Sequence, residues 1–236
     1  MQYKSSLQGQ AQSVSGAFAV LLRNVYTWMA CGLGMTALTS LIVSNQEELI
    51  YAIATNQVVF WGLFIAELAM VFILSSRIMK MSFATAGLMF AIYAILNGVT
   101  MSFIFLVYTT ESIAQTFFIT AGTFAGMSIL GYTIKKDLSA IGRVLYMALI
   151  GLIIATVVNL FFHNSGLTAI INYAGVLIFV GLTAYDTQKI KHMLQEYSQE
   201  GVSDQTNKLA LLGSLALYLD FINLFIYLLR IFGNRK

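Results

Sequence analysis

Long apolar stretches separated by short polar connections are the dominant pattern of this chain. A helix needs roughly 20 apolar residues to cross a bilayer. Stretches of about that length lie near 25–43, 58–76, 83–107, 112–134, 144–162, 167–188 and 209–232. The pattern therefore predicts an all-α membrane protein, folded as a bundle of seven transmembrane helices.

Composition supports this class. The 236 residues are 58% hydrophobic and only 10% charged, whereas a soluble domain carries about 25% charged residues. The net charge of +3 does not indicate a nucleic-acid partner. Because the connections are short, we expect one membrane domain, residues 25–236, preceded by a polar cytoplasmic segment, residues 1–24.

The placement of lysine and arginine predicts the orientation, because basic residues favour cytoplasmic connections. The connections 44–57, 108–111 and 163–166 contain none, whereas the N-terminal segment and the alternate connections each contain at least two. This places the N-terminus in the cytoplasm. Seven spans put the basic C-terminal residues on the opposite side. A last segment that enters and returns is the alternative, but it needs shielded non-helical backbone, so a full span is favoured.

Polar residues within the apolar stretches fall on single helix faces. The stripe in 209–232 consists of Gly213, Ala216, Asp220, Asn223, Tyr227 and Arg230. Shorter stripes consist of Asn172, Gly175, Thr183 and Asp186, and of Tyr93, Asn97 and Thr100. We expect these faces to point inward, where hydrogen bonding between helices is their simplest role. The last helix has the most polar stripe and is expected to be central.

Asp186 and Asp220 are the most informative of these residues. An ionisable side chain at membrane depth costs several kcal/mol by most scales and marks a candidate functional site. If the two carboxyl groups meet, like-charge repulsion in a low dielectric would let them share a proton. Spacing alone does not establish contact, since Asp186 lies three residues from Lys189 whereas Asp220 lies eleven residues from Leu209.

A GxxxG pattern, Gly122 to Gly126, lies in the fourth apolar stretch and predicts close helix packing there.

A third acidic residue, Glu67, lies near the middle of the second stretch. Three acidic residues on separate helices do not form a high-affinity calcium site, which needs many oxygen ligands together. The sequence therefore predicts no high-affinity metal site and no cofactor.

An intramembrane aspartyl protease is the enzyme alternative, since those enzymes also place two aspartates on adjacent helices, one in a Tyr-Asp pair like Tyr185-Asp186. Their second aspartate follows Gly-x-Gly, whereas Asp220 follows Leu217-Tyr-Leu219, and their proline-containing loop has no counterpart in a chain without proline. No other enzyme motif is evident, so we predict that the protein is not an enzyme. A proton-coupled transporter is disfavoured because no broken, inverted-repeat pattern is visible.

The segments around the two aspartates resemble the Bax inhibitor-1 family, also called the transmembrane Bax inhibitor motif family. The resemblance rests on VGLTAYDTQKIK at 180–191 and LALYLDFINLFIYLLRIFG at 215–233, with support from KKDLS at 135–139. It covers nearly the whole chain and is closest to inner-membrane members of Gram-negative bacteria.

The resemblance implies a seven-helix bundle around the last helix, and a pH-sensitive calcium leak with Asp186 and Asp220 as the proton sensor. It implies that Glu67 lies along the ion path, where Asn223 is also expected, and it makes Arg77 a candidate latch in a slightly different register. The implied partners are the bilayer and Ca²⁺ as permeant ion, in a bacterial inner membrane. The resemblance also implies an alternative function, a regulatory protein that binds and modulates a membrane protease or another membrane partner, with residues 1–24 as the expected contact.

Overall fold

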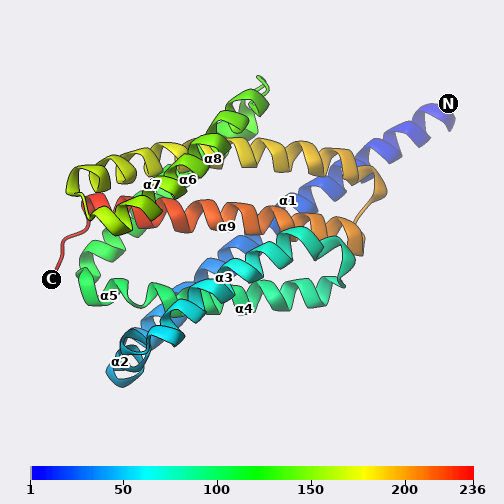
Figure 1. The fold of residues 1–236 in the computed structure, drawn as a ribbon. Helices are drawn as coiled ribbons and strands as arrows, with labels where there is room; N and C mark the ends of the chain where they lie inside the picture. Colours follow the sequence, from blue (N-terminus) through cyan, green and yellow to red (C-terminus); the bar gives the residue numbers. More distant parts are fainter. Residues whose placement is uncertain (1) are drawn as a thin grey trace. The chain divides into compact units, whose positions relative to one another are not determined.

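The structure, a computed structural model, describes residues 2–236, with side chains described from residue 14 onward. In this described part all the regular elements are helices, and seven of them are long and apolar enough to cross a membrane. The all-α, seven-span prediction is therefore confirmed. The elements are α1 (Gln2–Ser44), α2 (Glu47–Thr55), α3 (Gln57–Arg77), η1 (Ile78–Lys80), α4 (Phe83–Met101), α5 (Ile104–Val107), α6 (Thr110–Thr133), α7 (Ser139–Phe162), α8 (Ser165–Tyr197), η2 (Ser198–Glu200) and α9 (Asp204–Phe232) (Figure 1).

Several helices differ from the sequence-based expectation. The connection 44–57 contains the short helix α2. The first helix begins at Gln2, so the polar segment predicted at 1–24 is helical and continuous with the first span; residue 1 lies outside the described part. Helix α8 continues nine residues past the predicted end at 188. As a result His192, which lies beyond the predicted span, is part of α8.

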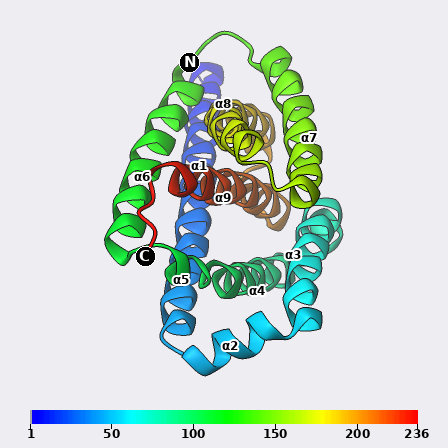
Figure 2. The same ribbon diagram turned by 60° about the vertical axis from the view of Figure 1, so that its left-hand side comes forward.

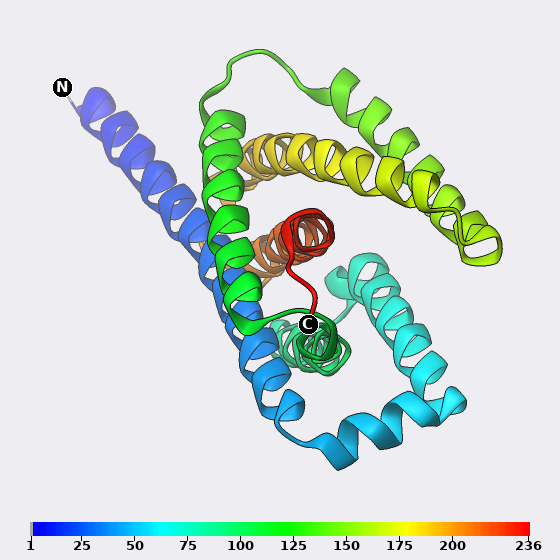
Figure 3. The ribbon, with the colours of Figure 1, turned by 90° about the vertical axis from the view of Figure 1, so that its left-hand side faces the viewer.

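Two compact units are formed by these helices, and α8 and α9 contribute to both. The first unit joins Met1–Leu106 to Ile190–Tyr218, and the second joins Val107–Lys189 to Leu219–Lys236. In the first unit α1 packs along α4, and α2 bridges the ends of α1 and α3 (Figure 3).

The interior of the first unit combines aromatic packing with buried hydrogen bonds. The fully buried ring of Tyr218 packs edge-on against Phe90 and Tyr93. Its hydroxyl lies 2.6 Å from the hydroxyl of Thr36, which also donates to the carbonyl of Ala94 at 2.9 Å. The buried hydroxyls of Tyr218 and Thr36 are thereby satisfied.

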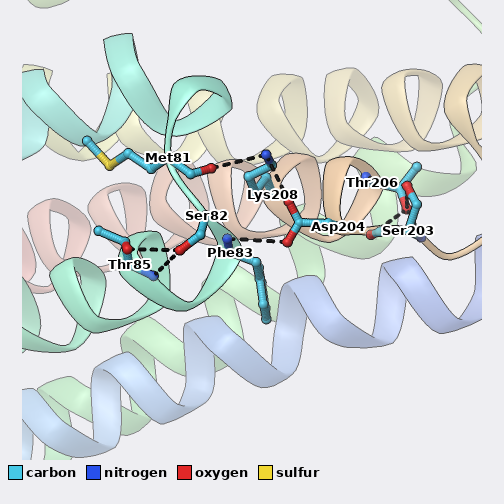
Figure 4. Close-up of polar contacts among 8 residues, drawn as sticks. All are labelled: Met81, Ser82, Phe83, Thr85, Ser203, Asp204, Thr206 and Lys208. Carbon is cyan, nitrogen blue, oxygen red and sulfur yellow. Dashed lines mark hydrogen bonds and ion pairs between the residues drawn. The ribbon is translucent and has the colours of Figure 1, made fainter.

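A group of polar contacts fastens the beginning of α9 to the connection between η1 and α4, again within the first unit (Figure 4). Lys208 Nζ lies 3.0 Å from Asp204 Oδ2 and donates to the carbonyl of Met81 at 3.1 Å. Asp204 in turn accepts from the backbone N–H of Phe83 at 3.3 Å. These contacts explain why α9 begins five residues earlier than its apolar pattern predicted.

In the second unit, α8 lies between α6 and α7 (Figure 2). Its apolar core consists of Leu152, Ile171, Ile178, Phe179, Leu182, Leu224 and Leu228. Gly131 of α6 packs directly on the backbone of Ala184, and Gly142 of α7 packs directly on the ring of Tyr185, so that a Cβ at either glycine would overlap α8. Glycine is thus required where the helices approach most closely.

The GxxxG prediction is wrong in its location. Neither Gly122 nor Gly126 has another part of the described chain within 4 Å of where a Cβ would be. The close approach of α6 instead occurs at Gly131, five residues farther on. Glycine is frequent in membrane helices, so the spacing alone did not identify the contact.

Helix α9 is unbroken over 29 residues, about 44 Å at 1.5 Å per residue, which supports the predicted full span. Beyond it, the backbone N–H of Asn234 donates to Ser112 Oγ at 2.8 Å, and its carbonyl accepts from Thr109 N–H at 3.0 Å. The N–H of Lys236 donates to the carbonyl of Val107 at 3.0 Å. The end of α9 and the beginning of α6 therefore lie at the same end of the second unit (Figure 3).

Burial confirms that the last helix is the central one. In its most apolar stretch 72% of the residues are buried, against 6% in α3 and in α7. Since a lipid-facing helix keeps apolar side chains on its outer surface, α3 and α7 are the helices expected to contact lipid most extensively.

Candidate functional site: a buried carboxyl pair

Asp186 of α8 and Asp220 of α9 meet inside the second unit. Their side chains lie within hydrogen-bonding distance of each other, and both residues are almost completely buried, 5% and 4% exposed. The residues around Asp220 are chiefly apolar, whereas Thr183, Thr187 and Gln188 lie close to Asp186 on α8. Burial nevertheless withdraws both carboxyl groups from water, which lowers the effective dielectric around the pair. The contact that spacing left open is therefore present.

The lengths of the two helices explain how these residues reach the same place. Asp186 lies eleven residues before the end of α8 at Tyr197, and Asp220 lies sixteen residues after the start of α9 at Asp204. Those separations correspond to about 16 Å and about 24 Å. Both helices extend beyond their apolar stretches, so the separations from Lys189 and from Leu209 did not give the distance of each aspartate from the end of its helix.

A third side chain, Tyr146 of α7, reaches the pair. Its hydroxyl donates toward both carboxyl oxygens of Asp186, at 3.2 Å to Oδ1 and 3.4 Å to Oδ2. The ring of Tyr146 also contacts the ring of Tyr185 edge-on, with centroids 6.0 Å apart. Asp186 therefore connects α8 to α9 on one side and to α7 on the other.

The two residues after Asp186 attach α8 to other elements. Thr187 Oγ1 lies 3.4 Å from Ser128 Oγ of α6. The buried carboxamide of Gln188 accepts from Leu138 N–H at 2.8 Å and donates to the carbonyls of Ile134 and Lys136 at 3.3 and 2.9 Å. One turn of α8 thus holds α6, α7 and the connection between them, which fixes the backbone that carries Asp186.

Asp220 Oδ2 is buried and has no hydrogen-bond partner in the described part of the chain. A buried oxygen without a donor is costly, and more so when it is charged. This atom is the point of the pair at which a hydrogen-bond donor or a cation would be most stabilising.

Glu67, the predicted ion-path residue of α3, belongs to the first unit. It is half-buried and accepts a hydrogen bond from Thr100 of α4. Tyr93 and Asn97 on the same face of α4 are buried, and Asn97 Oδ1 lacks a partner in the described region. The prediction that this face points inward is confirmed, while a role for Glu67 in an ion path stays a prediction.

Asn223 and Arg77 are the remaining predicted site residues. Asn223 is half-buried on α9 and donates from Nδ2 to the carbonyl of Leu219 at 2.8 Å, within its own helix. Arg77 ends α3 in the first unit and is exposed. Its role as a latch stays a prediction, as does the place of Asn223 along an ion path.

Comparison with known proteins identifies the family. The sequence profile of the family described as "Inhibitor of apoptosis-promoting Bax1" matches residues 19–236. The chain belongs to the Bax inhibitor-1 family. It is 47% identical to "Inner membrane protein YbhL" of Escherichia coli strain K12, over 91% of this chain and 92% of the relative. It is 43% identical to a protein of Borreliella burgdorferi over 91% and 92%, and 38% identical to a membrane protein of Streptococcus pyogenes serotype M1 over 89% and 90%.

Membership in the Bax inhibitor-1 family agrees with the multi-pass membrane fold, and the resemblance that pointed to the family is confirmed. No group of three or more histidine, cysteine, aspartate or glutamate side chains suited to a metal ion occurs among the described residues. Among the residues that the structure describes in this Bax inhibitor-1 protein, Asp186 and Asp220 are the two acidic side chains that are buried.

The apolar and polar patterns of the sequence did not predict Tyr146 or Gln188 as site residues. One signal could have suggested Tyr146, since it lies three residues after Arg143 at the start of its span, just as Asp186 lies three residues before Lys189. Basic residues mark the membrane boundary, so the two side chains were at similar predicted depths. No comparable pattern marked Gln188, whose partners are backbone atoms of a connection.

Proposed function

We propose that this Bax inhibitor-1 family member is a pH-sensitive leak for calcium or another cation, gated by Asp186 and Asp220. The observation that carries the proposal is the direct meeting of two buried carboxyl groups on two of the membrane-spanning helices. We further propose that it works in a bacterial inner membrane with a cytoplasmic N-terminus. YbhL, which is named an inner-membrane protein, and the distribution of basic residues support that location and orientation.

Proton exchange at the pair supplies the gating force. With one shared proton the two side chains form a hydrogen bond with a single negative charge. Loss of that proton leaves two charges, which repel by about 4 kcal/mol at about 4 Å and an effective dielectric constant of about 20. Such a repulsion favours separation of α8 from α9, and the titration belongs to the pair rather than to either residue.

A permeating cation would be bound only weakly. Carboxylate oxygens suit a hard cation such as calcium, but a lasting calcium site needs six to eight oxygen ligands. The pair and the separate Glu67 provide far fewer. This favours transient contact along a path, in which we propose roles for Glu67 and Asn223, with Arg77 as a latch.

Flux measurement with the purified protein tests this proposal. The protein is reconstituted into liposomes loaded with a calcium-sensitive dye, and influx is recorded from about pH 5 to about pH 8, the range in which cellular pH switches operate. Asp186→Asn and Asp220→Asn are compared with Asp204→Asn, which changes an exposed aspartate on the same helix α9. Flux is expected to depend on pH, and that dependence is expected to be lost or displaced in the first two variants alone.

Two other outcomes would each reject a different part of this proposal. No flux above that of empty liposomes at any pH rejects the leak and favours a protein that regulates a membrane protease or another membrane partner. Flux that responds to pH equally in all the variants keeps the leak and rejects the carboxyl pair as its sensor.

A further inference from the structure

We infer that Tyr146 is a positioning residue for the carboxyl pair, holding Asp186 in place and setting the pH at which the pair exchanges its proton. The inference rests on the proposed function, because it assigns regulation to that same pair. Its basis is the geometry of the Tyr146 hydroxyl, 3.2 and 3.4 Å from the two carboxyl oxygens of Asp186.

The hydroxyl is directed by the packing of α7 against Tyr185 of α8. One turn earlier on α7, Gly142 lies directly against the ring of Tyr185, which brings the two helices into close contact. The Tyr146 ring then meets the same Tyr185 ring edge-on, at an interplanar angle of 85°. A phenol ring has only two side-chain torsions, so these contacts fix the direction of its hydroxyl.

The beginning of α7 is itself attached to α8. Gln188 binds the backbone of the connection that leads into α7, through Leu138, Ile134 and Lys136. Asp186 and Gln188 are two residues apart on α8. The helix that carries the Tyr146 donor, α7, is therefore attached to α8 close to the Asp186 acceptor. The attachment of α7 to α8 therefore holds the backbone of Tyr146 close to Asp186.

The Tyr146 hydroxyl affects the protonation of Asp186 because it donates a hydrogen bond to that carboxyl group. A hydrogen bond donated to a carboxylate stabilises the charged form. The other ionisable groups facing Asp186 are Asp220 on α9 and Lys189 on α8, while Tyr185 on α8 faces Tyr146. The charge of Asp220 disfavours ionisation of Asp186, whereas the charge of Lys189 favours it. The hydrogen bond from Tyr146 also favours the ionised form of Asp186, and it comes from a different helix, α7.

A purely structural role for Tyr146 is the competing explanation. Tyr146 is 38% exposed, and tyrosine is common near membrane boundaries because its ring is apolar and its hydroxyl is polar. A tyrosine with that role alone would not alter the titration of a buried carboxyl pair. The experiment must therefore observe the proton on the pair and not only the activity.

Infrared difference spectroscopy of the purified protein in lipid gives that observation. The C=O stretch of protonated carboxyl groups is recorded against pH, and the band of the pair is identified by its loss in Asp186→Asn and Asp220→Asn. Tyr146→Phe is compared with Tyr185→Phe, a matched loss of a hydroxyl from the neighbouring ring. In Tyr146→Phe the midpoint is expected to rise by about one pH unit, the size expected for one hydrogen bond to a charged group.

The same variants are then measured in the liposome flux assay, where a pH midpoint displaced in the same direction is expected. An unchanged infrared midpoint in Tyr146→Phe, an equal displacement in Tyr185→Phe, or no carboxyl band assignable to the pair would each overturn the inference. A displaced infrared midpoint in a protein without flux would uphold the role of Tyr146 and reject the leak, so the two proposals fail separately.

Discussion

At the scale of single residues, the sequence identified the charged members of the site but not the groups that hold them. Asp186 and Asp220 were recognisable because a carboxyl group within an apolar span is costly and therefore uncommon. Tyr146 and Gln188 carry no such signal, since tyrosine and glutamine occur near span ends for many reasons. Their roles depend on which atoms they meet across helices, and one helix pattern does not contain that information.

Gln188 gives a test at this scale. Gln188→Met keeps a side chain of similar length but leaves the N–H of Leu138 and the carbonyls of Ile134 and Lys136 without their buried partner. Unsatisfied buried polar groups cost about 1–3 kcal/mol each, so we expect the free energy of unfolding in mixed detergent micelles to fall by at least about 2 kcal/mol. Amide hydrogen exchange in 134–138 should become faster.

Gln195→Met is the matched control, because Gln195 lies seven residues farther along α8 on the same face but is exposed. It should change neither the unfolding free energy nor the exchange in 134–138. Unaltered exchange in Gln188→Met would show that the carboxamide does not hold this connection.

At the scale of helices, apolar length predicted the spans, but the ends and contacts of the helices were less well determined. Helix α8 runs through Lys189, Lys191 and His192 because helical hydrogen bonding does not stop where apolar residues do. Close packing was predicted at Gly122 and Gly126 but occurs at Gly131 and Gly142. A glycine is needed only where a neighbouring backbone or ring occupies the space of its Cβ, and that depends on the partner helix.

Two glycines of α6 make a direct test of this argument. Gly131→Ala places a Cβ into the carbonyl of Ala184 on α8, and overpacking of this kind costs about 1–3 kcal/mol. Gly126→Ala, five residues earlier, meets open space and should leave stability unchanged or raise it by up to about 1 kcal/mol through helix propensity. Unfolding in mixed detergent micelles measures both variants.

The close approach at Gly131 also lies near the carboxyl pair, since Ala184 precedes Asp186 by two residues. Gly131→Ala is therefore expected to disturb the carboxyl infrared band as well as stability, while Gly126→Ala leaves the band in place. Equal unfolding free energies for the two variants would contradict the packing at Gly131.

At the scale of the whole molecule, the number of spans was predictable because bilayer thickness fixes the length of each one. The division into two units was not predictable, since it arises from how the long helices α8 and α9 are shared between them. The basic residues at the end of the chain were the one disagreement with the predicted orientation. The structure joins those residues to the beginning of α6, a segment without lysine or arginine.

Labelling of single cysteines tests that topology in a Cys31→Ser background. Glu111 and Arg235 are exposed at the end of the second unit where the tail meets α6, and Lys136 is exposed at the opposite end of α6. A membrane-impermeant maleimide applied outside intact spheroplasts should label Glu111→Cys and Arg235→Cys but not Lys136→Cys. Inverted vesicles should give the reverse, because α6 spans about 36 Å at 1.5 Å per residue. If Arg235→Cys instead labels together with Lys136→Cys, then α9 does not cross the membrane, and the basic tail obeys the charge rule by returning to the cytoplasm.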